Sequence, residues 1–128
     1  MRALEPLTGI RVVASPEVLA GSAWPDAVAV LRIAPDDVLV IGTTTIDVAD
    51  PDAIVVAETG FVGCWLTTED VRRDVLPHVD WELPAPEERP ALAQGYVAGV
   101  PAKLWLSGET ALLLCAAPYA HDLAERLS

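Results

Sequence analysis

Hydrophobic and polar positions along the chain form short apolar runs broken by proline, glycine and acidic residues, a pattern typical of strands joined by tight turns. The clearest case is AVAVLRI at 27–33 and DVLVIG at 37–42, on either side of a Pro-Asp-Asp sequence. Proline fixes φ near the value required early in a type I turn, and aspartate side chains bond nearby backbone N–H groups. These residues therefore predict a β-hairpin; a ligand-binding role for its acidic turn is the alternative.

A strand region is expected at 53–66, where Glu58-Thr59-Gly60 interrupts the apolar run and suggests a bulge or hairpin. The following segment, TTEDVRRDVLPHV, predicts a helix because Thr67 and Asp70 have the spacing of a capping box. Its apolar stripe consists of Val71, Val75, Leu76 and Val79. Pro77 should end or kink this helix.

The last third of the chain predicts two further strands, AQGYVAGVPAKLWLSG at 93–108 and TALLLCAA at 110–117. A terminal helix follows, with Pro118 in its first turn and Tyr119, Leu123 and Leu127 as one core-facing stripe. The element order predicts an α+β protein: a mainly antiparallel sheet with two helices, in which a ferredoxin-like β-α-β-β-α portion follows a β-hairpin. The length of 128 residues fits a single domain over 1–128.

The net charge of the chain argues against some classes of binding partner. The chain has 19 acidic and 8 basic side chains, a net charge of -11. A nucleic-acid binder needs clustered lysine and arginine to replace the counterions of the phosphates, so nucleic acid is not an expected partner. Anionic membrane surfaces are disfavoured for the same reason, and no apolar run reaches the roughly 18–20 residues that span a bilayer.

No apolar leader opens the sequence, so a cytoplasmic location with reduced thiols is expected. Cys64 and Cys115 each lie in an apolar run and are expected to be small buried hydrophobic residues. A nucleophile built from either cysteine with His78 or His121 is the alternative. Two cysteines and two scattered histidines do not predict a metal site.

No standard catalytic or phosphate-binding motif is present. Glu58 interrupts an apolar run, so it is either an exposed residue of a bulge or an inward carboxylate with a raised pKa. Lys103, the single lysine, either extends along an exposed strand face or contacts a ligand or interface. In the catalytic alternative, Glu58 and Lys103 line a pocket together with Tyr96, as a ligand-binding residue, and a histidine.

Four tryptophans accompany one phenylalanine. Trp24 and Trp81 lie in segments rich in proline and acidic residues, so each either anchors an interface or covers the core of its own domain. Trp65 and Trp105 lie in expected strands and are predicted to be core residues.

Several of these segments resemble one protein family. LRIAPDDVLVIG is similar to the "aPDExLl" signature of the small, gamma-type subunit of heterotetrameric sarcosine oxidases, within the superfamily of glycine-cleavage aminomethyltransferases and folate-binding proteins. GCWLTTEDVRRDVLPHVDWELP, LAQGYVAGVPAKLWL and ALLLCAAPYAHDLAERL resemble later elements in the same order, so the likeness spans about 28–128. In that family the proline-acid turn is a signature of the fold.

The resemblance implies an accessory subunit whose larger flavoprotein partners hold FAD, NAD or tetrahydrofolate, while this chain binds no cofactor. Folate-dependent aminomethyltransferases carry an aspartate in the strand that matches GVPAKL at 99–104, and no carboxylate is present there. Transfer of one-carbon units by this chain alone is therefore not expected. The alternatives are a small enzyme or ligand-binding protein that acts alone, and a homo-oligomeric interaction domain.

Overall fold

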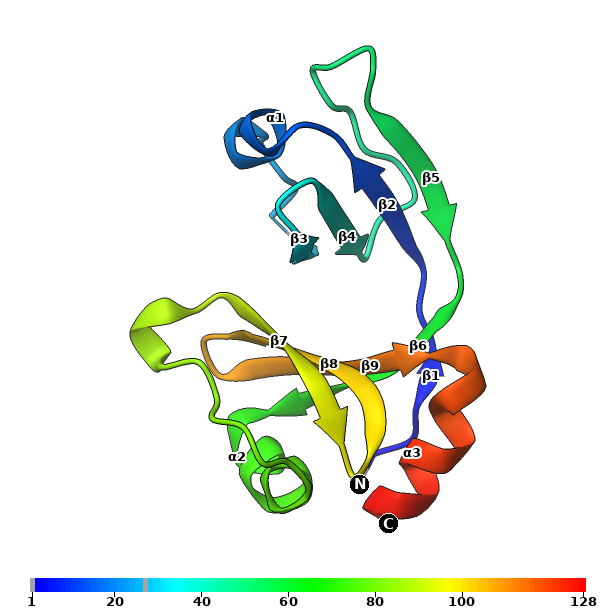
Figure 1. Cartoon of the computed structure of the whole chain (residues 1–128), viewed down its shortest axis with the longest axis vertical. Helices are drawn as coiled ribbons and strands as arrows, with labels where there is room; N and C mark the ends of the chain where they lie inside the picture. Colours follow the sequence, from blue (N-terminus) through cyan, green and yellow to red (C-terminus); the bar gives the residue numbers. More distant parts are fainter. Residues whose placement is uncertain (1, 27) are drawn as a thin grey trace. The chain divides into compact units, whose positions relative to one another are not determined.

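The computed structural model describes residues 2–26 and 28–128. The chain divides into two compact units, which we call unit 1 (Met1–Pro6 and Gly60–Ser128) and unit 2 (Leu7–Thr59). Each unit contains one antiparallel sheet with few helices, so the predicted α+β class is confirmed (Figure 1). The expectation that 1–128 folds as one domain stays a prediction, which a single cooperative unfolding transition would support.

Unit 2 has a four-stranded sheet in the order β3-β4-β2-β5. Its elements are β2 (Gly9–Val13), α1 (Pro16–Gly21), β3 (Ala29–Ala34), β4 (Asp37–Ile41) and β5 (Ile54–Glu58). One face of the sheet packs with α1 around a core of Ile10, Val12, Leu19, Val38 and Val40. The sequence analysis did not identify α1, although Ser15 caps it by accepting a hydrogen bond from the Val18 N–H and Pro16 lies in its first turn.

The predicted hairpin of unit 2 is confirmed. β3 ends at Ala34 and β4 begins at Asp37, so Pro35 and Asp36 form the turn between them. The register shifts between Arg32 and Ala34, where a bulge bends the strand. The start of the expected strand, at Ala27, lies outside the described residues.

Unit 1 has a five-stranded sheet in the order β1-β6-β9-β8-β7. Its strands are β1 (Glu5–Pro6), β6 (Phe61–Thr67), β7 (Ala91–Val97), β8 (Val100–Ser107) and β9 (Thr110–Ala116). One sheet face packs against two helical segments around a core that includes Leu66, Val75, Leu104, Leu113 and Leu123. Burying such apolar side chains supplies most of the driving force for folding.

The first helical segment of unit 1 begins as predicted. It consists of α2 (Thr68–Asp70), a π-helical turn η1 (Val71–Val75) and a 3₁₀ turn η2 (Leu76–His78). The Thr67 hydroxyl accepts from the Asp70 N–H at 3.1 Å, and the Asp70 carboxylate accepts from the Thr67 N–H at 3.0 Å. This capping box satisfies two backbone donors at the start of the helix. Pro77 lies in η2, where the helix ends.

The predicted strand over 93–108 is wrong in one respect, because β7 and β8 are two strands of a hairpin. Ala98 and Gly99, with φ of 50° and 78°, form the turn between them. Two successive residues with positive φ match the twist of a tight hairpin. The Ala98 N–H also donates to the His78 carbonyl at 2.8 Å, which holds the turn beside the first helical segment. The ferredoxin-like order therefore gains one strand and becomes β-α-β-β-β-α.

Three local expectations need correction. Thr59 and Gly60 form neither a bulge nor a hairpin, because they connect β5 in one sheet to β6 in the other. Tyr119 is 43% exposed rather than in the core, because it lies in the 3₁₀ turn η4 (Ala117–Tyr119) before α3 (Ala120–Leu127). Trp65 is 41% exposed, because along β6 it alternates with the core residues Cys64 and Leu66 and lies on the opposite sheet face.

The rest of the last helix agrees with expectation. Leu123 and Leu127 are buried on one side of α3. His121 lies on the exposed side, where its Nε2 is 3.3 Å from the Glu125 carboxylate. Within the described ranges, no helix is both long enough and apolar enough to cross a lipid bilayer.

Candidate functional site

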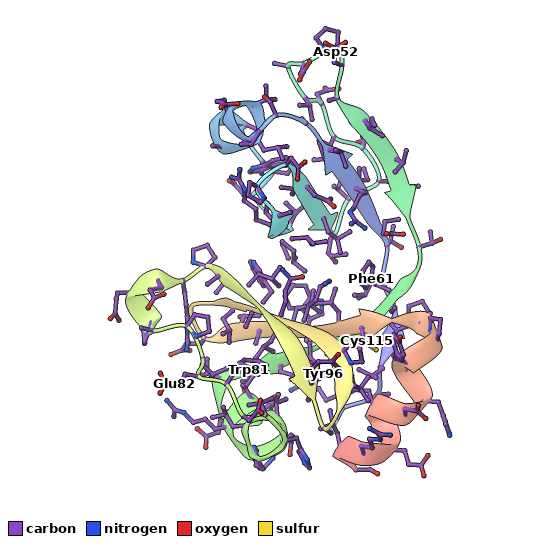
Figure 2. The ribbon with its side chains drawn as sticks, viewed as in Figure 1. Asp52, Phe61, Trp81, Glu82, Tyr96 and Cys115 are labelled. Carbon is purple, nitrogen blue, oxygen red and sulfur yellow. The ribbon has the colours of Figure 1, made fainter. Side chains whose placement is uncertain are left out.

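A groove in unit 1 contains two of the residues singled out from the sequence, Tyr96 and Lys103. Its volume is about 470 Å³, which falls in the range of small-ligand sites. Side chains and backbone of β6, β7, β8, β9 and the following turn line it: Phe61, Gln94, Gly95, Tyr96, Pro101, Ala102, Lys103, Cys115, Ala116 and Tyr119. Figure 2 labels Phe61, Tyr96 and Cys115, which come from three different strands.

Strand pairing explains how the polar residues of the groove meet. Gln94 of β7 lies directly opposite Lys103 of β8, and Tyr96 lies opposite Pro101. Residues two apart on a strand share a face, so these four side chains lie on one side of the sheet. The Lys103 Nζ donates to the Gln94 Oε1 at 2.7 Å. The groove thus presents a cationic amine and an amide between aromatic rings.

The chemistry available in the groove favours binding over catalysis. No carboxylate or imidazole is among its lining residues, so it lacks the usual general bases. Burial raises the pKa of the Cys115 thiol, which keeps that thiol protonated and weakly nucleophilic at neutral pH. The rings of Tyr96 and Tyr119 are both exposed, at 63% and 43%, so a ligand could contact them without rearrangement of the strands.

The expected catalytic set is not assembled in the groove. Glu58 ends β5 in unit 2, where its carboxylate accepts from the Arg11 Nη1 at 3.2 Å. His78 and His121 are exposed residues of helical segments in unit 1, and neither lines the groove. Of the four sequence candidates, the lining residues therefore include Tyr96 and Lys103 but not Glu58 or a histidine.

Sequence reasoning missed the arginine that organises the acidic residues of unit 2. Arg11 lies in β2 between the neighbouring strands, and its Nε and Nη2 donate to the two oxygens of Asp37 at 2.6 and 2.7 Å. The hydrogen bond to Asp37 is the main cause of a raised pKa for Arg11. A lone arginine inside the apolar stretch GIRVV was the signal. Asp37, next to the hairpin turn, thus has a structural partner across the sheet.

Both tryptophans considered as interface anchors contact the core of their own unit. Trp81 packs against the core of unit 1, and its Nε1 donates to the Tyr96 carbonyl at 3.1 Å. Its indole covers Gly95 so closely that a Cβ there would lie 2.9 Å from Nε1. Trp24 is half-buried against the core of unit 2. These contacts fit the alternative of covering a core, and an interface role for either residue stays a prediction.

The buried cysteines behave as the sequence suggested. Cys64 and Cys115 are both buried in unit 1. Loss of hydration on burial raises the pKa of Cys64 to about 11, so neither thiol has the low pKa of a reactive cysteine. Within residues 2–26 and 28–128, no group of three histidine, cysteine, aspartate or glutamate side chains is placed to hold a metal ion.

A second candidate site is the outer strand of unit 2. Ile54, Val55 and Val56 at the start of β5 are exposed by 57%, 41% and 51%. β5 is an edge strand of its sheet and pairs with β2. Single exposed apolar residues are common, but consecutive ones on an edge strand form a surface to which the strand of another chain can pair.

Comparisons with known protein families and with curated proteins found no match for this chain. The resemblance to sarcosine oxidase small subunits therefore stays an expectation from the sequence. Function has to be argued from the chemistry of the groove and of β5.

Proposed function

We propose that this chain is a non-catalytic accessory subunit of a multisubunit, flavin-dependent amine oxidase or dehydrogenase similar to sarcosine oxidase. The observation that carries the proposal is the exposed apolar strand β5. An uncovered edge strand of this kind invites pairing with any available strand, and proteins that function as monomers usually protect such edges. A permanent partner subunit would cover it. The kind of assembly is inferred from the sequence resemblance to sarcosine oxidase small subunits.

The chemistry of the chain supports a non-catalytic role. The groove has no general base among its lining residues, and both buried thiols have raised pKa values. Ala102 and Lys103 stand where aminomethyltransferases are expected to carry an aspartate. A neutral methyl group and a cation cannot accept a proton or stabilise a developing positive charge.

FAD and NAD would be held by the partner subunits. A dinucleotide usually places its pyrophosphate at a glycine-rich turn that leads from a strand into a helix. The helix after β6 is instead capped by Thr67, and Glu69 and Asp70 occupy its first turn. These carboxylates would repel a pyrophosphate, so this chain does not fit a dinucleotide at that position. In the proposal it binds no tetrahydrofolate either.

The test is purification of the tagged protein from its own host at low salt, followed by native mass measurement and visible absorption spectroscopy. The proposal expects a complex with at least one larger chain and the absorption of a bound flavin. A colourless monomer or homodimer in repeated preparations would overturn it, and a homodimer would favour the homo-oligomeric alternative.

The groove favours a second candidate function, the binding of a small carboxylate with an apolar body. Lys103 and Gln94 would contact the carboxylate, and Phe61, Tyr96 and Tyr119 would contact the apolar part. Benzoate is a suitable probe, with binding followed by NMR shifts of the groove residues. Lys103→Met should abolish these shifts, whereas Lys103→Arg should retain them in part. Unchanged spectra of the wild-type protein at millimolar benzoate would count against this function.

A further inference from the structure

The outer side of β5 is the starting point. β5 pairs with β2 in an antiparallel register that runs from Ile54 opposite Val13 to Glu58 opposite Gly9. The sheet order places no other described strand beyond β5, which lies at the outer side of unit 2 (Figure 1). In an antiparallel edge strand, alternate residues direct their N–H and C=O groups away from the sheet. These groups can form a ladder with an added strand.

The two edges of this sheet differ in how they are protected. At the opposite edge, β3 carries the exposed Arg32, contains a bulge after it, and is followed directly by Pro35. Charge, bulge and proline are the usual devices that prevent edge pairing. From Ile54 to Ala57, β5 contains only exposed apolar residues and has a regular register with β2. One edge is thus blocked and the other is left open to pairing.

Charges at the ends of β5 indicate what kind of strand would pair there. Asp50 and Asp52 form the turn that precedes β5, where the Asp50 carboxylate accepts from the Asp52 N–H at 2.9 Å. Glu58 is the last residue of the strand, and its carboxylate accepts one hydrogen bond from Arg11. Arg11 is also paired with Asp37, so one cation faces two carboxylates and this end of β5 keeps a net negative charge. The open edge is therefore apolar in the middle and acidic at both ends. A complementary strand is apolar in the middle and carries lysine or arginine at its ends.

The same charges disfavour a second copy of this chain as the occupant. If two β5 strands paired antiparallel about Val55, Asp52 of each copy would lie opposite Glu58 of the other. If they paired about Val56, Glu58 would lie opposite Ile54. The first register sets like charges against each other and the second sets a carboxylate against an apolar side chain, and both are unfavourable.

We infer that β5 is the docking site for a β-strand of the partner subunit, an apolar strand with basic residues at its ends. The added strand extends the sheet of unit 2 to the order β3-β4-β2-β5-partner. Backbone hydrogen bonds give the ladder its strength, and the flanking charges set the register and exclude a second copy. This inference rests on the proposed function, because it identifies where the partner subunit binds.

The experiment compares four tagged proteins purified from the host at low salt: wild type, Ile54→Lys, Asp52→Lys and Ala20→Lys. Ile54 is the most exposed large apolar residue of β5, and a lysine there blocks edge pairing. Ala20 is an exposed residue of α1 in the same unit, so Ala20→Lys adds the same charge away from β5. Circular dichroism and thermal unfolding of each isolated chain verify that the variants fold.

Ile54→Lys should weaken the assembly at least roughly tenfold, and Ala20→Lys should leave it unchanged. Asp52→Lys should weaken it by a smaller factor and make it less sensitive to salt, because an attractive charge is lost. A folded Ile54→Lys variant that assembles like wild type would overturn the inference while leaving the proposed function intact.

Two other outcomes also contradict the inference. A homodimer of the wild-type chain that Ile54→Lys disrupts would identify a second copy as the occupant of β5. Absence of any assembly of the wild-type chain would overturn the proposed function, and the docking inference with it.

Discussion

Replacing Arg11 by methionine tests whether the acidic residue beside the hairpin turn has a structural role. Arg11 donates two hydrogen bonds to Asp37, at 2.6 and 2.7 Å, and one to Glu58 at 3.2 Å. It thereby connects β4 and β5 across the central strand β2. Methionine retains most of the aliphatic length of the side chain, so the substitution removes mainly the charge and the three donors.

The expected loss of stability depends on how well water reaches the Arg11–Asp37 ion pair. The side chains of Arg11 and Asp37 are 30% and 20% exposed, so the pair lies between an open surface pair and a buried one. Hydrogen bonds to charged groups contribute about 1.5–3 kcal/mol when shielded, against about 0.2–1 kcal/mol for exposed ion pairs. We therefore expect Arg11→Met to lower the free energy of unfolding by about 2 kcal/mol, with the longer contact to Glu58 contributing least.

Equilibrium urea unfolding, followed by far-ultraviolet circular dichroism, measures this loss. Arg73→Met is the matched control, because Arg73 also contacts two carboxylates, those of Asp70 and Asp74, but is 64% exposed. Its effect should be clearly smaller. A double-mutant cycle with Asp37→Asn should give a coupling of about 1 kcal/mol or more. A loss below about 0.5 kcal/mol for Arg11→Met, or one equal to the control, would refute the reasoning.

Three further predictions concern unit 1. Thr67→Ala removes half of the capping box and should lower the free energy of unfolding, measured by chemical denaturation, by about 1 kcal/mol. An unchanged free energy of unfolding would contradict a stabilising role of the cap. Gly95→Ala should cost about 1–3 kcal/mol by displacing Trp81 and should change tryptophan fluorescence, whereas Gly21→Ala, which meets nothing within 4 Å, should be neutral or slightly stabilising. Folding raises the pKa of Cys64 from 9.0 to about 11. The contribution of this thiol to the free energy of unfolding is therefore fully present below pH 9 and is lost between pH 9 and 11. An equal loss of stability over this pH range in Cys64→Ala would contradict this.

Local signals in the sequence predicted several elements correctly. The Pro35-Asp36 turn and the Thr67 capping box were both found because proline and capping side chains act on their immediate backbone neighbours. The α+β class followed from the alternation of strand and helix patterns. In these places local preference and tertiary structure agree, which is the usual condition of a foldable sequence.

The errors arose where local patterns are ambiguous. Ala98-Gly99 lies inside a long apolar run with no proline or asparagine at the turn, and alanine seldom adopts positive φ. The turn between β7 and β8 was missed for these reasons. Trp65 was misplaced because hydrophobicity does not tell which face of a strand is covered. The helix after Ser15 is hard to recognise from the sequence because proline usually ends a helix, although Pro16 suits a first turn.

The candidate sites were predicted only in part. Tyr96 and Lys103 line the same groove because the pairing of β7 with β8 places them on one face. In a single strand over 93–108 these two residues, seven apart, would lie on opposite faces, so alternation alone did not predict that they meet. Glu58 was grouped with Tyr96 and Lys103 on residue type alone. Its contact with Arg11 depends on the pairing of two strands that lie far apart in the sequence. The open edge of β5 could not be recognised from the sequence, since edge position is a property of the whole sheet.

Hydrogen–deuterium exchange of the β5 amides tests the central claim most directly. It compares residues 54–58 in the assembly purified from the host with the same residues in the isolated chain. If a partner strand pairs with β5, the amides directed away from β2 should exchange much more slowly in the assembly, while those of α1 should not change. Equal exchange at 54–58 in the two samples would show that the partner does not dock at this edge and would contradict the account.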